Sequence, residues 1–190
     1  FMFFYSVTFG GFVGLASSLV IYFNTQYGLD PKMAGYFTAA CVFAGSLVRP
    51  IGGNVADRIG GIKSLSVMYV FAALFLGIVS FDLPEAWMAL AAFVCAMLAL
   101  GMGNGAVFQL VPQRFHKEIG VMTGLVGMAG GVGGFYLASS LGYSRQLTGS
   151  YQAGFLVFAA LALVALSGLS LVKARWRTTW GAPHVTSARI

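Results

Sequence analysis

The chain has 190 residues, of which 58% are hydrophobic and only 8% are charged, and its formal net charge is +6 at pH 7. A soluble globular domain carries about a quarter charged residues, so this composition excludes that class. Apolar residues run continuously instead of alternating with polar ones, which excludes a membrane β-barrel and predicts an all-α membrane protein.

Six apolar stretches have close to the ~20 residues that a transmembrane helix needs. The predicted spans are 3–23, 34–56, 62–81, 86–111, 119–141 and 152–172. Turn-forming residues separate them, for example Asp30-Pro31 and Gly60-Gly61. We therefore expect a six-helix transmembrane unit over residues 1–173 and a cytoplasmic tail over residues 174–190. The chain begins at Phe1, already in apolar sequence and without a flanking segment before the first span, so we expect it to be part of a longer protein.

The basic residues predict the orientation in the membrane. Eight of the eleven Lys and Arg residues fall on one side of the predicted spans: Arg58, Lys63, Arg114, Lys117, Lys173, Arg175, Arg177 and Arg189. Only Lys32 and Arg145 fall on the other side. Because cytoplasmic loops of membrane proteins are enriched in Lys and Arg, both ends of this chain are expected in the cytoplasm. The charge is thereby explained by topology, and no nucleic-acid partner is expected.

Arg49 is the remaining basic residue, and it lies inside the second predicted span. A guanidinium at the centre of a span costs roughly 2.5–3.5 kcal/mol on insertion scales, so such residues usually serve a cavity, a partner or a ligand. Pro50 cannot donate a hydrogen bond to the carbonyl of Ser46, which weakens the helix beside the charge. One interpretation is that Arg49 only satisfies loose backbone carbonyls. The alternative is that it binds a small anion.

The second interpretation is favoured because no Asp, Glu or His occurs inside any predicted span, and Lys63 is only the second residue of the span 62–81. At ~4 Å and an effective dielectric near 20, an anion would gain roughly 4 kcal/mol from Arg49. The planar guanidinium donates in a fork that suits flat, singly charged oxyanions. Tyr5 and Phe9 are one helical turn apart and could border such an anion, although most of the seventeen Phe residues are expected to meet lipid or other helices.

Glycine is the second patterned residue type, with 26 in the chain. In the fifth span, glycines recur at steps of three and four residues and predict one bare stripe: Gly120, Gly124, Gly127, Gly131 and Gly134. Gly10 and Gly14 share the four-residue step, as do Gly101 and Gly105. Such stripes let helices approach closely. We expect this one to mark either a moving helix interface or backbone that comes near a substrate.

Little in the sequence points to an enzyme. His116 and His184 lie in a short loop and in the tail, and no nucleophile, base or metal cluster has usable spacing. Cys41 and Cys95 fall within apolar spans and are expected to be inert core thiols. We therefore expect no catalytic residues, no metal site and no cofactor.

Several stretches resemble a known family. Gly53-Asn-Val-Ala-Asp57-Arg58-Ile-Gly60-Gly61 resembles the GxxxDRxG loop motif of the major facilitator superfamily, in which it recurs between the second and third helices of each half. Four further segments resemble the nitrate/nitrite porter family of that superfamily, the last of them its glycine-rich signature: Thr8–Gly14, Leu47–Gly53, Gly101–Phe115 and Lys117–Phe135. The resemblance covers essentially the whole chain.

The resemblance implies that the chain is the C-terminal six-helix half, helices seven to twelve, with the 3+3 inverted repeat of that fold. It implies that Arg49 binds nitrate and that Tyr5 and Phe9 border it. Asn104 and Gln109 are weaker candidates, as polar groups that line the cavity or form hydrogen bonds between helices. The signature glycines are then Gly124, Gly127, Gly130, Gly131, Gly133 and Gly134, where helices would move during alternating access. The loop motif is Gly53, Asp57, Arg58 and Gly60.

The expected function is secondary transport of nitrate, nitrite or both across the inner (plasma) membrane. The N-terminal half that would complete the substrate site is absent, so these residues alone should not transport. Exchange of nitrate for nitrite fits spans without carboxylates better than a proton relay, unless the other half holds one. Two alternatives remain open: a carrier of another small anionic or organic solute in the same superfamily, and a non-transporting membrane subunit in which Arg49 is structural.

Overall fold

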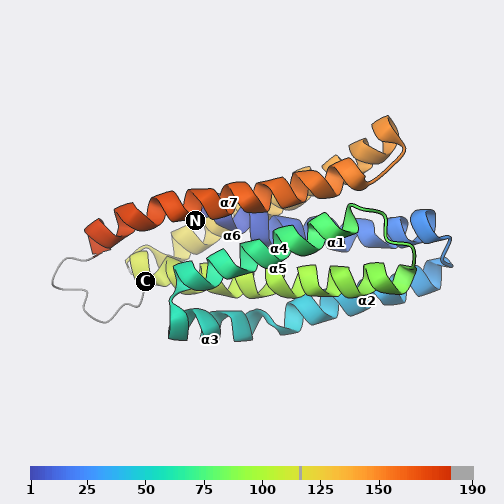
Figure 1. Cartoon of the computed structure of the whole chain (residues 1–190). Helices are drawn as coiled ribbons and strands as arrows, with labels where there is room; N and C mark the ends of the chain where they lie inside the picture. The colour runs from blue at the N-terminus through green and yellow to red at the C-terminus, as the bar shows by residue number, and fades with distance from the viewer. Residues whose placement is uncertain (116, 181–190) are drawn as a thin grey trace.

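The computed structural model describes residues 1–115 and 117–180, and these residues form a bundle of α-helices (Figure 1). The helices are α1 (Met2–Tyr27), α2 (Pro31–Leu47), α3 (Arg49–Ile59), α4 (Gly61–Val79), α5 (Ala86–Arg114), α6 (Ile119–Thr148) and α7 (Gln152–Trp180). Within the described residues, six helical segments are long and apolar enough to cross a membrane, because α2 and α3 together make one span, Pro31–Ile59. The six-span all-α fold predicted from the sequence is confirmed.

The helix ends follow from local sequence. Gly28 adopts a left-handed conformation (φ 63°) and closes α1 with a hydrogen bond from its N–H to Phe23 O. Asp30 caps α2 by accepting the N–H of Lys32 at 3.1 Å, and Pro31 occupies the first helical turn. α7 continues to Trp180, beyond the boundary expected at residue 173. The part of the predicted tail over residues 181–190 lies outside the described residues, as does His116.

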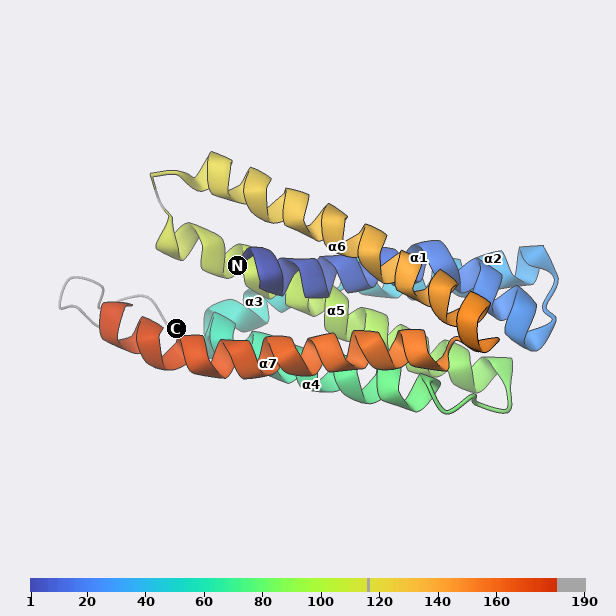
Figure 2. The same ribbon diagram turned by 90° about the horizontal axis from the view of Figure 1, so that it is seen from above.

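α1 and α5 occupy the middle of the bundle. α1 packs most extensively against α6 and also contacts α2, α5 and α7, whereas α5 contacts α2, α3 and α4. Figure 2 shows α6 lying obliquely over α1, with its C-terminal end close to α7 and its N-terminal end away from it. This splay leaves part of α6 without a neighbour among the described helices.

Two apolar clusters hold the helices together. Near the C-terminal end of α1, Tyr22 makes edge-on contacts with Phe93 and Phe155, each with ring centroids 5.3 Å apart. Toward the other end, the buried Tyr69 donates a hydrogen bond from its hydroxyl to Phe4 O at 2.8 Å. Because this bond joins α4 to α1 inside the bundle, the start of α1 is fixed against α4.

The ends of several helices are tied by the loop between α4 and α5. Asp82, a non-glycine residue with φ 48°, accepts hydrogen bonds from Gln152 at 2.6 Å and from Gln26 at 3.5 Å. Tyr27 donates to Leu83 O at 2.9 Å. The C-terminal end of α1 and the N-terminal end of α7 are therefore both bonded to this loop.

Candidate functional site

Arg49 lies at a break in the second span. The helix stops at Leu47, Val48 forms the junction, and α3 starts at Arg49 with Pro50 in its first turn. This agrees with the weakening that Pro50 predicts, although one helix over 34–56 was expected here, not two. The break places the guanidinium at the start of α3, in the middle of the Pro31–Ile59 span.

The guanidinium of Arg49 lies over aromatic rings of α1. Its Cζ is 4.5 Å from the centroid of Phe12 and 5.5 Å from that of Phe9. Such cation–π contacts are worth about 0.5–2 kcal/mol, depending on how dry the site is. Tyr5 stacks on Phe9 with ring centroids 5.0 Å apart, so it belongs to the same group of rings that borders Arg49. The structure thus brings Arg49, Tyr5 and Phe9 together.

No protein oxygen neutralises Arg49 within residues 1–115 and 117–180. Its Nε is buried and has no hydrogen-bond partner among them, and no ion pair involves its side chain. A buried guanidinium N–H without an acceptor is costly, by about 1–3 kcal/mol or more. The interpretation that Arg49 satisfies loose carbonyls is therefore not supported by these contacts, and the site can accept an anion.

Phe12 is a part of this site that the sequence analysis missed. It is closer to the guanidinium than Phe9 is, and its ring lies against the bare backbone of Gly45, one turn before Arg49. The signal was present, because Phe9 and Phe12 are three residues apart and share a helix face. However, Phe12 is set apart from the other phenylalanines only by the way α2 and α3 pack against α1, which the sequence does not show.

Asn104 lies on α5 and is only 1% exposed. Both ends of its carboxamide are buried without a hydrogen-bond partner among the described residues. Its neighbours along the helix face are Leu100, which lies against Gly11 of α1, and Phe108, which meets Tyr5 edge-on at 4.7 Å. Asn104 therefore belongs to the face of α5 that meets the α1 aromatics. Gln109 also has a buried, unpaired Oε1, near Gly61.

The glycines of α6 divide into two faces. A Cβ built on Gly130 would lie 2.7 Å from ring atoms of both Tyr5 and Phe9, and those on Gly133 and Gly134 would meet Ser6 and Val13 of α1. By contrast, nothing lies within 4 Å of a Cβ built on Gly120, Gly124, Gly127 or Gly131. The single stripe expected from spacing is thus two surfaces: one packs on α1 beside the aromatic pair, and the other has no neighbour among the described residues.

The loop motif forms the connection between α3 and α4. Gly60 has φ 96°, a backbone conformation that residues other than glycine rarely adopt, and it links the two helices directly. Asp57 and Arg58 are exposed in the last turn of α3. Gly53 faces α5, where a Cβ would lie 3.8 Å from Gly105 O. The motif residues therefore shape a tight helical turn and place two charges at the end of the bundle.

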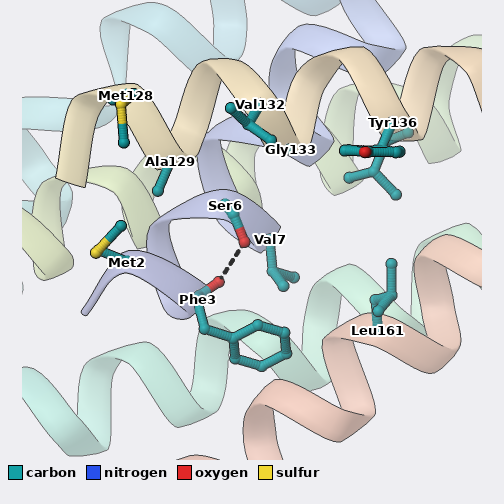
Figure 3. Close-up of a pocket in the computed structure, with 11 residues that line it drawn as sticks. Met2, Phe3, Ser6, Val7, Met128, Ala129, Val132, Gly133, Tyr136 and Leu161 are labelled. Atoms are coloured by element: carbon teal, nitrogen blue, oxygen red, sulfur yellow. Dashed lines mark hydrogen bonds between the residues drawn. The ribbon is translucent and has the colours of Figure 1, made fainter. Parts of the chain in front are cut away.

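A separate apolar pocket of about 420 Å³ lies between α1, α6 and α7 (Figure 3). Phe3, Ser6 and Val7 line it from α1, and Leu161 lines it from α7. Arg49 and Asn104 do not line this pocket, and its only side-chain hydroxyls are those of Ser6 and Tyr136. It is therefore distinct from the Arg49 site.

Sequence comparison places the chain in a family. The profile of the Major Facilitator Superfamily matches residues 1–138. The chain belongs to the major facilitator superfamily. It is 38% identical over 170 residues to the "Nitrite extrusion protein" of Bacillus subtilis, covering 89% of this chain and 42% of that protein. It is 37% identical over 155 residues to the "Probable nitrate transporter NarT" of Staphylococcus carnosus, covering 78% and 39%.

A third relative is the "Probable nitrate/nitrite antiporter NarK1" of Thermus thermophilus, 31% identical over 192 residues and covering 90% of this chain and 43% of that protein. These relatives confirm the predicted membership of the nitrate/nitrite porter family within the superfamily. The chain spans about two fifths of the length of the curated relatives that it matches. It is a multi-pass membrane protein of this family, with six spans over the described residues.

Proposed function

We propose that the chain is the C-terminal six-helix half of a carrier that moves nitrate, nitrite or both across the inner (plasma) membrane by alternating access. Carriers of this superfamily bind substrate near the bilayer midplane, between two related halves. The missing N-terminal half would supply the other wall of the site. On this proposal the protein is a carrier and not an enzyme, and both ends of the chain lie in the cytoplasm.

One observation carries the proposal: a guanidinium in the middle of a membrane span has ring faces beside it and no acceptor among the described residues. Its planar fork of donors matches a flat oxyanion, which Lys could not do as well. Tyr5, Phe9 and Phe12 would border the bound anion and exclude water. A drier site strengthens the attraction between Arg49 and the anion.

The buried Asn104 is proposed as a second polar group for the anion or for a water beside it. Its unpaired donors and acceptor sit on the face of α5 that meets the Tyr5 region. A carboxamide that remained dry and unpaired would destabilise the fold by about 1–3 kcal/mol for each lost partner. Binding a polar ligand would remove that cost.

The glycines of α6 would serve the movement between states. The open face, with Gly124, Gly127 and Gly131, is proposed to face the N-terminal half, while Gly130, Gly133 and Gly134 keep α6 on α1. The names of the relatives support nitrate and nitrite as substrates, and one of them is named an antiporter. Spans without internal carboxylates are consistent with exchange of the two anions.

The decisive experiment uses the complete carrier in proteoliposomes, with nitrate, nitrite and chlorate as test anions. We expect Arg49→Ala to abolish uptake of nitrate and nitrite while the protein still inserts and unfolds normally. We expect Arg49→Lys, which keeps the charge but loses the planar fork, to be strongly impaired as well. Nitrate uptake by Arg49→Ala at the unsubstituted rate would refute the anion site.

The same assay separates the alternative functions. A carrier of a larger organic anion would have a roomier site, and its transport would survive Arg49→Lys better than a nitrate site would. A non-transporting subunit would lose stability in Arg49→Ala without any selective loss of anion binding.

A further inference from the structure

The helix is weakened beside Arg49 but not fully interrupted. Val48 keeps helical hydrogen bonds, donating to Ala44 O and accepting from Gly52 N, whereas Pro50 leaves the carbonyl of Ser46 without its helical donor. The guanidinium has only ring-face contacts with the described residues, which set its direction weakly. Packing against a neighbouring helix is therefore a further determinant of where the backbone of Arg49 lies.

Helix α5 contacts the backbone on both sides of the break through two glycines. A Cβ built on Gly101 would overlap the carbonyl oxygen of Gly45, and one built on Gly105 would overlap the carbonyl oxygen of Arg49 itself. The Cβ on Gly105 would also lie 2.7 Å from the backbone nitrogen of Gly53. Because these neighbours are backbone atoms, a side-chain rearrangement cannot relieve either contact.

We propose that Gly105 is a positioning residue for the anion site: its bare backbone lets the Arg49 main chain seat on α5 and so sets where the guanidinium lies. This inference rests on the proposed function. A side chain at position 105 would push the Arg49 carbonyl away from α5, and the movement would pass directly to the guanidinium. A misplacement of about 1 Å in a binding group can cost on the order of 100-fold in activity.

Gly101 provides a matched control. It lies one turn earlier on α5 and makes the same kind of contact, but with Gly45 on the other side of the break. Alanine at either position adds one methyl group between α5 and the second span, against α2 at position 101 and against α3 at position 105. A purely structural role predicts the same outcome for both variants, whereas positioning predicts that only Gly105→Ala changes the anion affinity strongly.

The test measures the KM and kcat for nitrate uptake by the complete carrier in proteoliposomes, together with the unfolding midpoint. We expect both alanine variants to lower the midpoint by similar amounts. We expect Gly105→Ala to raise the KM for nitrate at least roughly tenfold, within the effect that a misplaced group can have, and Gly101→Ala to change it less than about threefold. An unchanged KM in Gly105→Ala, or an equal rise in Gly101→Ala, would overturn the positioning role.

Pro50→Ala keeps the inference testable if Gly105→Ala does not accumulate. It restores the donor to Ser46 O without adding a group to α5. If α5 sets the position of Arg49, the KM of Pro50→Ala stays within about threefold of the unsubstituted value, whereas a break that itself positions Arg49 predicts a rise of tenfold or more. Absence of saturable nitrate uptake in the unsubstituted carrier would refute the proposed function as well. If the unsubstituted carrier takes up nitrate and the Gly105→Ala variant has the same KM, only the positioning role is refuted.

Discussion

The two faces of α6 predict opposite effects for the same substitution at Gly130 and at Gly127. A Cβ on Gly130 would lie 2.7 Å from Phe9 Cδ1 and from Tyr5 Cδ1 and Cε1, whereas ordinary contact begins at 3.4 Å. The rings or α6 must therefore move by about 0.7 Å, the difference between these two distances. Tyr5 also meets Phe108 edge-on, with ring centroids 4.7 Å apart, which limits how far its ring can move.

The expected difference in stability follows from two terms. Replacing glycine by alanine inside a helix stabilises the folded state by about 1 kcal/mol, and this term is common to both variants. Overpacking of the ring contact costs about 1–3 kcal/mol and applies only to Gly130→Ala. Gly130→Ala should thus be less stable than Gly127→Ala by about 1–3 kcal/mol, since the helix term cancels.

The assay is unfolding of this chain in mixed detergent micelles, followed by circular dichroism, with the unsubstituted chain as reference. Equal stability of the two variants, or a less stable Gly127→Ala, would refute the assignment of the two faces. The complete carrier adds a second readout. If the N-terminal half covers the open face, Gly127→Ala will impair transport there while leaving the isolated chain intact.

Three further outcomes follow from single contacts. Phe12→Leu removes the ring face closest to the guanidinium, worth about 0.5–2 kcal/mol, and should raise the KM for nitrate by roughly 2- to 30-fold; an unchanged KM would contradict that contact. Tyr69→Phe removes the hydroxyl that bonds Phe4 O and should destabilise the chain by about 0.5–1.5 kcal/mol in detergent unfolding, so a neutral effect would argue against the bond. Ser144 donates to Ser150 O at 2.7 Å and accepts from Gly154 N at 3.1 Å, so Ser144→Ala should loosen the α6–α7 connection and lower the unfolding midpoint, whereas an unchanged midpoint would count against it.

Sequence reasoning located the spans because hydropathy over about 20 residues is a strong signal in a membrane protein. It also found Arg49, since a charge inside an apolar run stands out against its surroundings. The spacing of Tyr5 and Phe9 correctly placed them on one face of α1, and the structure brings both to the Arg49 region. These features depend on local sequence alone.

Other features depend on which helices meet, and the sequence could not supply that. The glycine steps of α6 fit a stripe through Gly127 and Gly131, yet the glycines in contact with α1 are Gly130, Gly133 and Gly134. A three- or four-residue period identifies faces but does not tell which one has a neighbour. Likewise, Asn104 was a candidate for a bond between helices, but it makes none with the described residues.

The Asp82 loop has a consequence for how this half can move. Its bonds to Gln26 and Gln152 tie α1 and α7 to one point, close to the end of α4. In a carrier that works by rocking of its two halves, the α4–α5 loop and the adjoining ends of α1 and α7 would move together as one rigid body. Pairs of spin labels placed across it should therefore keep one distance distribution in both the inward- and outward-open states.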